Sequence, residues 1–599
     1  MSPPRIITRR NLIATMAGAA GSAMLGASAF GQGISSRNVK PQPRGKPSGR
    51  PFLARLTDVA KQAGLTQPVV YGGIDSKSYI IEVVGCGVAF IDYDNDGWVD
   101  LLVLSGTRLE GPPPGASNRL YKNNRDGTFT DVTARAGLLR TGWASAVTVG
   151  DYDNDGFDDI FITYYGNNVL YHNNGDGTFS DVTERAGLRQ AAVRYGSGCT
   201  WVDYDRDGWL DLFVANYLNT TLEKLPKPGE NPDCTWKGVP VNCGPRGLPT
   251  GFVQLFHNNG DGTFTDVSRV SGVSAAAGSY PMTAVAADYD NDGWPDLFVA
   301  NDGLNAYLYH NERNGKFDEI GTITGMGLTA RGSAMAAMCI SLGDYDNDGW
   351  LDLFITDFQK NSDHLWHNDG KGSFDEVSDQ AGITVPTRDV LSFGGGFFDY
   401  DNDGWLDLFI ANGHVYPEVE QVSPDVHFKQ INSLFHNEGN GKFTETTKTA
   451  GSGFQTPYVG RGVAFADFDN DGFMDVVVGN NGDPPLLLHN SGGNGNHFLN
   501  FKLAGTKSNR DAMGARIRVQ TGSVSQIREI AGGGSYLSQS DLRAHFGLGR
   551  ATRAETVEVK WPSGLRQVFH DVDADKFYLI EEGKVQLGQQ RIARRVVNR

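Results

Sequence analysis

The sequence predicts an all-β protein, a seven-bladed β-propeller followed by a small β-rich C-terminal domain. Three observations support this prediction. An Asp-rich pattern of nine residues occurs seven times, a hairpin pattern alternates with it, and the 599-residue chain contains 77 glycines. Such a composition is typical of many short strands joined by tight turns rather than of helices.

The Asp-rich pattern reads D-x-D-x-D-G-x-x-D. We number its seven copies loops 1 to 7 by their first residues: Asp92, Asp151, Asp203, Asp288, Asp344, Asp399 and Asp467. Successive copies start 52 to 85 residues apart, and the four short spacings of 52 to 59 residues define the repeat unit. The two longer spacings predict insertions, at about residues 217–251 and 412–428.

The hairpin pattern is exemplified by LYHNNGDGTF at residues 170–179. Asn-Gly and Asp-Gly turns between aromatic and β-branched residues favour a β-hairpin. Together with strands such as WLDLFVAN, each unit supplies about four strands, the size of a propeller blade. Six histidines share one position of this hairpin and are predicted to be repeat scaffolding: His172, His257, His310, His367, His436 and His489.

The two ends of the array predict ring closure. Residues 52–65 match the second half of a hairpin, and residues 486–490 match the first half. Joining them completes one blade from both ends and removes the open sheet edges that invite aggregation. An open solenoid is the alternative.

The Asp-rich loops predict structural calcium sites, up to seven in all. Carboxylates at positions one, three, five and nine, with the carbonyl of position seven, supply the hard oxygens that calcium prefers. Zinc is excluded on the ground that no Cys or His accompanies the carboxylates. An EF-hand is excluded because position twelve is apolar in every copy instead of Glu. The alternative, Asp-Gly turns without metal, leaves four repelling carboxylates in nine residues.

The predicted ligands of the loops, in chain order, are Asp92, Asp94, Asp96, Trp98 and Asp100; Asp151, Asp153, Asp155, Phe157 and Asp159; Asp203, Asp205, Asp207, Trp209 and Asp211; Asp288, Asp290, Asp292, Trp294 and Asp296; Asp344, Asp346, Asp348, Trp350 and Asp352; Asp399, Asp401, Asp403, Trp405 and Asp407; and Asp467, Asp469, Asp471, Phe473 and Asp475.

Residues 1–30 predict an export signal. Arg9 and Arg10 precede an apolar run that ends in Ala27-Ser28-Ala29, which resembles a twin-arginine signal with its cleavage site. An ordinary secretory signal is the alternative. Residues 31–50 are predicted to be a flexible linker. Because of the export signal, the mature protein is expected in the periplasm or outside the cell. No later apolar run is long enough to span a bilayer, and a net charge of −17 argues against a nucleic-acid partner.

Five cysteines occur in the chain. Cys234 and Cys243 flank a short loop and are candidates for a disulfide in an oxidising compartment. Cys86, Cys199 and Cys339 lie in strand-like sequence just before Asp-rich loops and are expected to be buried as small apolar residues.

The loops and hairpins resemble the FG-GAP, or VCBS-type, repeats of integrin α-chain propellers. Residues 496–519, 532–549 and 557–564 resemble the ASPIC/UnbV domain of cartilage acidic protein-like proteins. The resemblance implies a calcium-binding propeller at residues 51–490, an ASPIC/UnbV domain at 491–586 and a tail at 587–599. A polar set in that domain has either a site role or a buried structural role: Asn509, Arg510, Asp511, Arg516, Gln539 and His545.

The sequence contains no recognisable catalytic constellation. We therefore expect a binding module, adhesion-like, for a glycan or protein ligand. Insertions on a rigid ring commonly carry recognition, so the nominated ligand-binding residues are Asn412, His414 and Tyr416 from one insertion and Trp236, Lys237 and Arg246 from the other. One alternative is an enzyme that tailors a natural product or polysaccharide at the propeller mouth, as the resemblance to enediyne-cluster UnbV proteins implies. A second is a purely structural surface protein.

Overall fold

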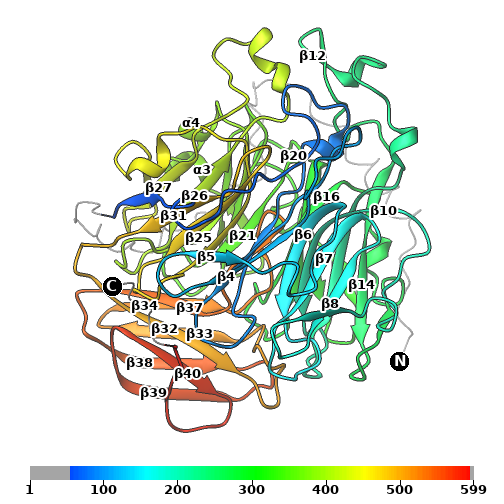
Figure 1. Ribbon diagram of the computed structural model, residues 1–599. Coiled ribbons are helices and arrows are strands. Elements are labelled where there is room, and N and C mark those ends of the chain that lie inside the picture. The colour runs from blue at the N-terminus through cyan, green and yellow to red at the C-terminus, as the bar shows by residue number, and fades with distance from the viewer. Residues whose placement is uncertain (1–53, 594–599) are drawn as a thin grey trace, which may run out of the picture. The chain divides into compact units, whose positions relative to one another are not determined.

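The computed structural model describes residues 54–593. The predicted signal and linker, residues 1–50, lie outside the described residues, as do residues 594–599 of the predicted tail. The described chain is all-β, as predicted (Figure 1). Its helices are short, with α2 at Gly321–Thr324, α3 at Ser378–Ala381 and α4 at Thr384–Thr387. None of the helices between residues 54 and 593 has the length and apolar character needed to cross a lipid bilayer.

Antiparallel strands form four-stranded groups, and each Asp-rich loop joins the first two strands of one group. We call the group that carries loop 1 blade 1, and so on. Blade 1 consists of β2 (Val88–Ile91), β3 (Asp100–Val103), β4 (Arg119–Asn123) and β5 (Phe129–Asp131), and blade 2 of β6 (Trp143–Gly150), β7 (Asp159–Gly166), β8 (Val169–Asn173) and β9 (Phe179–Asp181). Blade 3 consists of β10 (Arg194–Val202), β11 (Asp211–Leu218), β14 (Thr250–Asn258) and β15 (Phe264–Asp266). Blade 4 consists of β16 (Pro281–Ala287), β17 (Asp296–Leu304), β18 (Tyr307–Asn311) and β19 (Phe317–Glu319).

Blades 5 to 7 follow the same plan. Blade 5 consists of β21 (Ile340–Gly343), β22 (Asp352–Ile355), β23 (His364–Asn368) and β24 (Phe374–Glu376). Blade 6 consists of β25 (Ser392–Phe398), β26 (Asp407–Asn412), β27 (Ser433–Asn437) and β28 (Phe443–Glu445). Blade 7 consists of β29 (Gly460–Ala466), β30 (Asp475–Asn480), β31 (Leu486–Asn490) and β1 (Leu56–Asp58). In blade 7, β1 pairs with β31, so one blade combines both ends of the array, as its hairpin halves predict.

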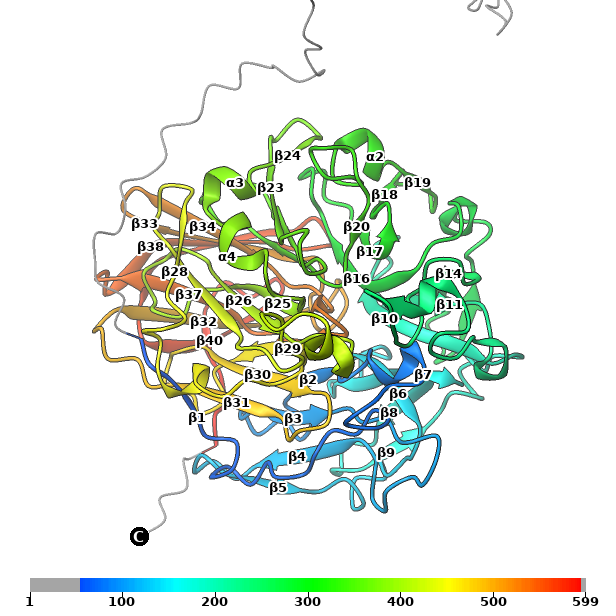
Figure 2. The ribbon, with the colours of Figure 1, turned by 90° about the horizontal axis from the view of Figure 1, so that it is seen from above.

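The first strands of the blades lie around a common centre (Figure 2). Strands β2, β6, β10, β16, β21, β25 and β29 contact one another in that order, and β29 contacts β2 again, which closes the ring. Apolar side chains from facing sheets fill the spaces between blades, where most of them are fully buried. The insertion after β11 carries the short hairpin β12 (Thr235–Trp236) and β13 (Val239–Pro240).

The C-terminal part adds two four-stranded sheets, in the strand orders β37-β32-β40-β41 and β34-β33-β38-β39. Their strands are β32 (His497–Ala504), β33 (Arg516–Thr521), β34 (Val524–Glu529), β37 (Ala544–Gly549), β38 (Arg553–Lys560), β39 (Arg566–Asp573), β40 (Lys576–Glu581) and β41 (Gly588–Gln589). Between β34 and β37, the strands β35 (Gly534–Ser535) and β36 (Ser538–Gln539) leave these sheets, and β36 pairs in parallel with β2 of blade 1.

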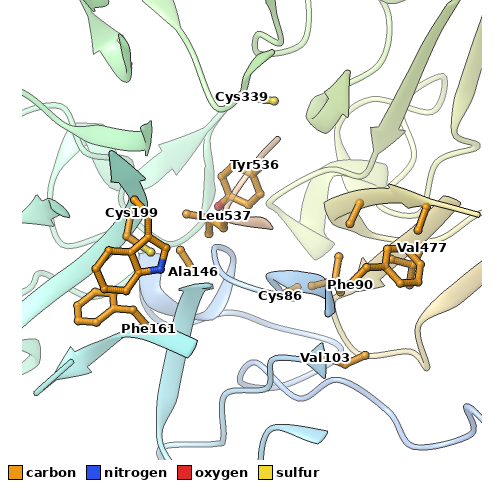
Figure 3. Close-up of a cluster of buried hydrophobic side chains, with 14 of the residues drawn as sticks. Cys86, Phe90, Val103, Ala146, Phe161, Cys199, Cys339, Val477, Tyr536 and Leu537 are labelled. Atoms are coloured by element: carbon orange, nitrogen blue, oxygen red, sulfur yellow. The ribbon is translucent and has the colours of Figure 1, made fainter. Parts of the chain in front are cut away.

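Residues 531–542, which we call the plug, fill the middle of the ring. Tyr536 is fully buried, with its ring centroid 5.1 Å from that of Phe393. Figure 3 shows Tyr536 and Leu537 among the buried side chains of several blades, including the three cysteines expected to be buried. Bonds to the plug come from the first strands of five blades: Val88 N–H to Ser538 Oγ, Val147 N–H to the Leu537 carbonyl, Thr200 Oγ1 to the Gly532 carbonyl, Gly395 N–H to Ser535 Oγ and Phe465 N–H to Ser540 Oγ.

These bonds have a direct consequence for folding. Buried backbone N–H and C=O groups need hydrogen-bond partners. The first strand of each blade faces the centre of the ring and has no neighbouring strand of its own blade on that side. The plug supplies such partners to backbone N–H groups in blades 1, 2, 6 and 7, so the ring and the C-terminal part form one structural unit.

Candidate metal centre

The Asp-rich loops share one backbone conformation, and side-chain caps stabilise it. In loop 2, Asp151 accepts hydrogen bonds from the backbone N–H groups of Asp155 (3.0 Å) and Gly156 (2.7 Å). Asp155 in turn accepts one from the N–H of Phe157, at 2.9 Å. The glycine at position six has a φ of 85 to 95° in the seven loops, a conformation that favours glycine. Position four also has a positive φ, 54 to 61°, which explains why Asn occupies it in six loops.

The aspartate at position nine anchors the loop to the neighbouring strands. In loop 2 this residue is Asp159, which is fully buried at the start of β7. Its Oδ1 accepts the backbone N–H of Asn173 at 2.7 Å and lies 3.2 Å from His172 Nδ1. The side chain of Asn173 then donates to the carbonyl of Tyr93 in blade 1, at 2.9 Å. Each loop is therefore tied both to its own hairpin and to the preceding blade.

Positions three and five converge with the hairpin histidine. In loops 2 to 6 one ligand atom from each of these three residues lies within 4.8 Å of the others, as in the group Asp153, Asp155 and His172. The sequence-based exclusion of zinc rested on the absence of an accompanying histidine, and that premise is wrong. The error arose because the histidine lies 21 to 54 residues after the first residue of its loop and reaches the loop only through the register of the third strand.

The carboxylates are crowded and partly unsatisfied. Buried Oδ1 atoms of Asp94, Asp153, Asp205 and Asp401, all at position three, accept no hydrogen bond from the described residues. Burial raises the pKa of Asp151 to about 8, with further contributions from neighbouring aspartates. Burial, followed by repulsion from Asp401, raises the pKa of Asp403 to about 9. A bound cation would relieve this repulsion, and a donor set dominated by carboxylates fits calcium.

The C-terminal domain binds backbone and side-chain atoms of these loops, a role that the sequence did not reveal. Arg543 donates to the Asp467 carbonyl at 3.0 Å and to Asn470 Oδ1 at 2.8 Å. Asp511 accepts the backbone N–H of Asp151 at 2.7 Å. The predicted polar set makes similar contacts: Asn509 to Asp203, the Arg510 N–H to Asn154, Arg516 to the Asp288 carbonyl, and His545 beside the Gly472 carbonyl, whereas Gln539 bonds within the plug.

The residues nominated for ligand binding come together from the two insertions. The ring centroid of Trp236 lies 5.6 Å from that of Tyr416 and 5.9 Å from that of His414. Lys237 Nζ donates to Ser423 Oγ at 2.5 Å. The first insertion is closed by a disulfide between Cys234 and Cys243.

Burial separates these nominated residues into two groups. Asn412 and His414 are fully buried, and Tyr416 is nearly so. Burial, reinforced by Arg461, lowers the pKa of His414 to about 3, so its imidazole is neutral. Lys237 and Arg246 are exposed, and Trp236 is partly exposed. Of the nominated residues, those of the second insertion are therefore buried, and those of the first reach the surface.

The fold and the loops define a propeller built from repeats, with an Asp-rich loop in every blade. Comparison with known families agrees: the FG-GAP-like repeat matches at residues 92–162, 151–214, 246–299, 288–355, 344–410 and 399–478, and the ASPIC and UnbV domain matches at residues 505–587. The chain belongs to the FG-GAP-like repeat family and ends in an ASPIC and UnbV domain.

Curated relatives match over most of the chain. Cartilage acidic protein 1 of Xenopus tropicalis is 25% identical over 523 residues, covering 80% of this chain and 70% of the relative. The mouse (Mus musculus) protein of the same name is 26% identical over 511 residues, with the same coverage.

Similarity to solved structures is weaker. The chain is similar to an Agrocybe aegerita lectin described as recognising non-reducing terminal N-acetylglucosamine, with a TM-score of 0.33, 17% identity and coverage of 60% of this chain and 79% of the lectin. It is also similar to YCF48 bound to D1 peptide, with a TM-score of 0.37, 7% identity and coverage of 71% and 97%. These scores are too low to support a functional argument.

Proposed function

We propose that this protein is an exported, calcium-stabilised propeller that acts as an interaction module for a glycan or protein ligand. The observation that carries the calcium part is that the buried Oδ1 atoms of Asp153, Asp205 and Asp401, at position three of loops 2, 3 and 6, accept no hydrogen bond from the described residues. Calcium takes six to eight oxygen ligands in flexible geometry, which matches carboxylates supplied by one tight loop. The nearby histidine adds a nitrogen that a transition metal would also accept, so metal identity is part of the test.

A single loop tests the calcium assignment. Asp205→Ala removes the position-three carboxylate of loop 3 and should lower the number of bound calcium ions by one, measured by native mass spectrometry after dialysis against calcium. Asp261→Ala is the matched control, because Asp261 is an exposed residue in the hairpin turn of the same blade and accepts its hydrogen bonds from Thr263. Equal calcium counts in both variants and the unmodified protein would reject loop 3 as a site. Zinc instead of calcium in the unmodified protein would reject the metal assignment.

The interaction part rests on the joined insertions. Both insertions depart from the repeat, and they meet where Trp236 packs against Tyr416. The first insertion exposes Lys237, the neighbour of Trp236 in the chain, and also Arg246. An aromatic face beside hydrogen-bond donors suits a sugar ring or a polar peptide. A glycan array probed with the mature protein should show a defined set of bound oligosaccharides, and Lys237→Ala with Arg246→Ala should abolish that binding. Retained binding in this double variant would move the site elsewhere.

Export is tested in the unprocessed chain. Replacement of both Arg9 and Arg10 by Lys should cause the precursor to accumulate inside the cell if the twin-arginine route is used. Normal processing of this variant would favour the ordinary secretory route, and absence of processing in the unmodified chain would reject the signal.

A further inference from the structure

Loop 1 differs from the other loops at the hairpin position that faces its carboxylates. Six blades place a histidine there, and blade 1 places Lys122. The register shows that these positions are equivalent: Lys122 pairs with Thr130 in blade 1, just as His172 pairs with Ser180 in blade 2 and His257 with Thr265 in blade 3. The loop itself is unchanged, because DYDNDGWVD retains all four aspartates.

The lysine side chain reaches into the loop. Its ammonium group forms a short ion pair with Asp94 Oδ2 and lies 3.7 Å from Asp96 Oδ2. These two carboxylates, at positions three and five, correspond to those that converge with histidine in loops 2 to 6. The ammonium group also lies 5.5 Å from the ring centroid of Tyr93, and Arg125 Nε approaches Asp96 to 4.0 Å. Fixed positive charge is therefore present where the other loops have an imidazole.

We infer that the ammonium group of Lys122 takes the place of the metal ion in loop 1, so that this loop is closed without metal and the ring holds at most six ions. A lysine ammonium offers only donors and cannot be a ligand while it is charged. A divalent ion between the same two carboxylates would have to displace it against charge repulsion. This inference rests on the proposed function, since it assumes that the other loops bind calcium.

Loop 4 shows why the position of the cation matters. Arg313 also pairs with a loop carboxylate, Asp292, but its side chain is 55% exposed and approaches from the turn of the hairpin. His310 still occupies the hairpin position of that blade, with Nδ1 3.9 Å from Asp290 Oδ2. We therefore count loop 4 among the metal sites and loop 1 outside them.

The experiment compares calcium counts by native mass spectrometry in the full mature protein. Asp94→Asn in loop 1 should leave the count unchanged, whereas Asp205→Asn, the matched variant in loop 3, should lower it by one. Lys122→His, which restores the residue of the other blades, should raise the count by one. Loss of one ion in Asp94→Asn would overturn the inference, as would an unchanged count in a folded Lys122→His protein.

A metal-free measurement keeps the two claims separate. Lys122→Met retains an unbranched side chain, one atom shorter, and removes the charge. In excess chelator the melting temperature of this variant should fall by about 2 °C or more, because Asp94 and Asp96 lose their cation. If the unmodified protein binds no calcium, the proposed function fails. The role of Lys122 is then decided by comparing the melting temperatures of Lys122→Met and the unmodified protein in chelator. An unchanged melting temperature for Lys122→Met would then overturn that role.

Discussion

Loops 1 and 6 have almost the same sequence, DYDNDGWVD and DYDNDGWLD, but different surroundings. In loop 1 Asp94 and Asp96 are partly exposed, and Lys122 pairs with them. In loop 6 Asp401 and His436 are 5% and 4% exposed, and the Asp401 carbonyl accepts a bond from Asn496 Nδ2 in the segment that leads to β32. The comparison teaches that the motif alone does not determine how its charge is neutralised. The neighbouring third strand and the C-terminal domain determine it.

The C-terminal part of the chain donates hydrogen bonds to both loops. This shared contact gives the prediction with the largest expected effect. The Ala593 N–H donates to the Asp96 carbonyl of loop 1, and the Gly549 N–H donates to the Asn402 carbonyl of loop 6, each at 2.8 Å. Tyr536→Ala should remove the centre of the plug and cost about 3–5 kcal/mol of unfolding free energy. Urea unfolding should show this loss with and without calcium, in a single transition. Two separate transitions in the unmodified protein would contradict the single unit.

The next largest effect is a change in stability on removing one carboxylate, and in chelator its sign should differ between loops 1 and 6. Asp401→Asn should destabilise the protein in calcium, by about 2.7 kcal/mol if free calcium is one hundred times the dissociation constant of the lost ion. In excess chelator the same variant should melt at an equal or higher temperature, because it relieves repulsion within loop 6. Asp94→Asn should lower the melting temperature in both conditions, because it breaks the pair with Lys122. Identical behaviour of the two variants would remove the distinction between the loops.

Proton binding should replace calcium binding in the metal-free protein. Burial first, and then neighbouring aspartates, raises the pKa of Asp403 to about 9 and that of Asp151 to about 8, against about 3.9 in an unfolded chain. These folded-state carboxyls bind protons that the unfolded chain has released, so their contribution to stability is lost as pH rises through 8 to 9. Melting temperature in chelator should fall between pH 6 and 9, and calcium should remove most of this fall. A melting temperature that rises over this range would contradict the raised pKa values.

The smallest expected effect is on the rate at which calcium leaves loop 6. Asn494 and Asn496 both donate to the Asp401 carbonyl. Replacing either by Ala should speed the release of one calcium ion by about fivefold, for a bond worth about 1 kcal/mol. Stopped-flow release into a fluorescent chelator would measure this. Asn174→Ala is the control, because Asn174 is exposed and bonds within the hairpin turn of blade 2.

Much of the fold was predictable because each blade repeats its own signals. Loop spacing, hairpin turns and the divided blade at the array ends all have local sequence signatures, and the family match agrees with them. The side chain that faces each loop was visible as a periodic histidine, with Lys122 as the exception. Its role required the strand register, which no local signal specifies.

The plug and the contacts of the C-terminal domain were not predictable. Residues 531–542 show no periodicity that would place Tyr536 at the ring centre, and the partners of Arg543 in loop 7 lie more than 70 residues away in the chain. The burial of His414 likewise depends on Trp236 from the other insertion, which a reading of each insertion alone does not reveal. In each case the determinant is a contact between segments that are remote in sequence.

The most direct test of the account is the calcium content and the melting temperature of the mature protein, each measured with and without chelator. The account predicts several bound calcium ions, at most six, and a large fall in melting temperature when they are removed, because a ligand that binds only the folded state stabilises it. A protein without calcium, whose melting temperature does not respond to chelator or to added calcium, would contradict the assignment of these loops as metal sites.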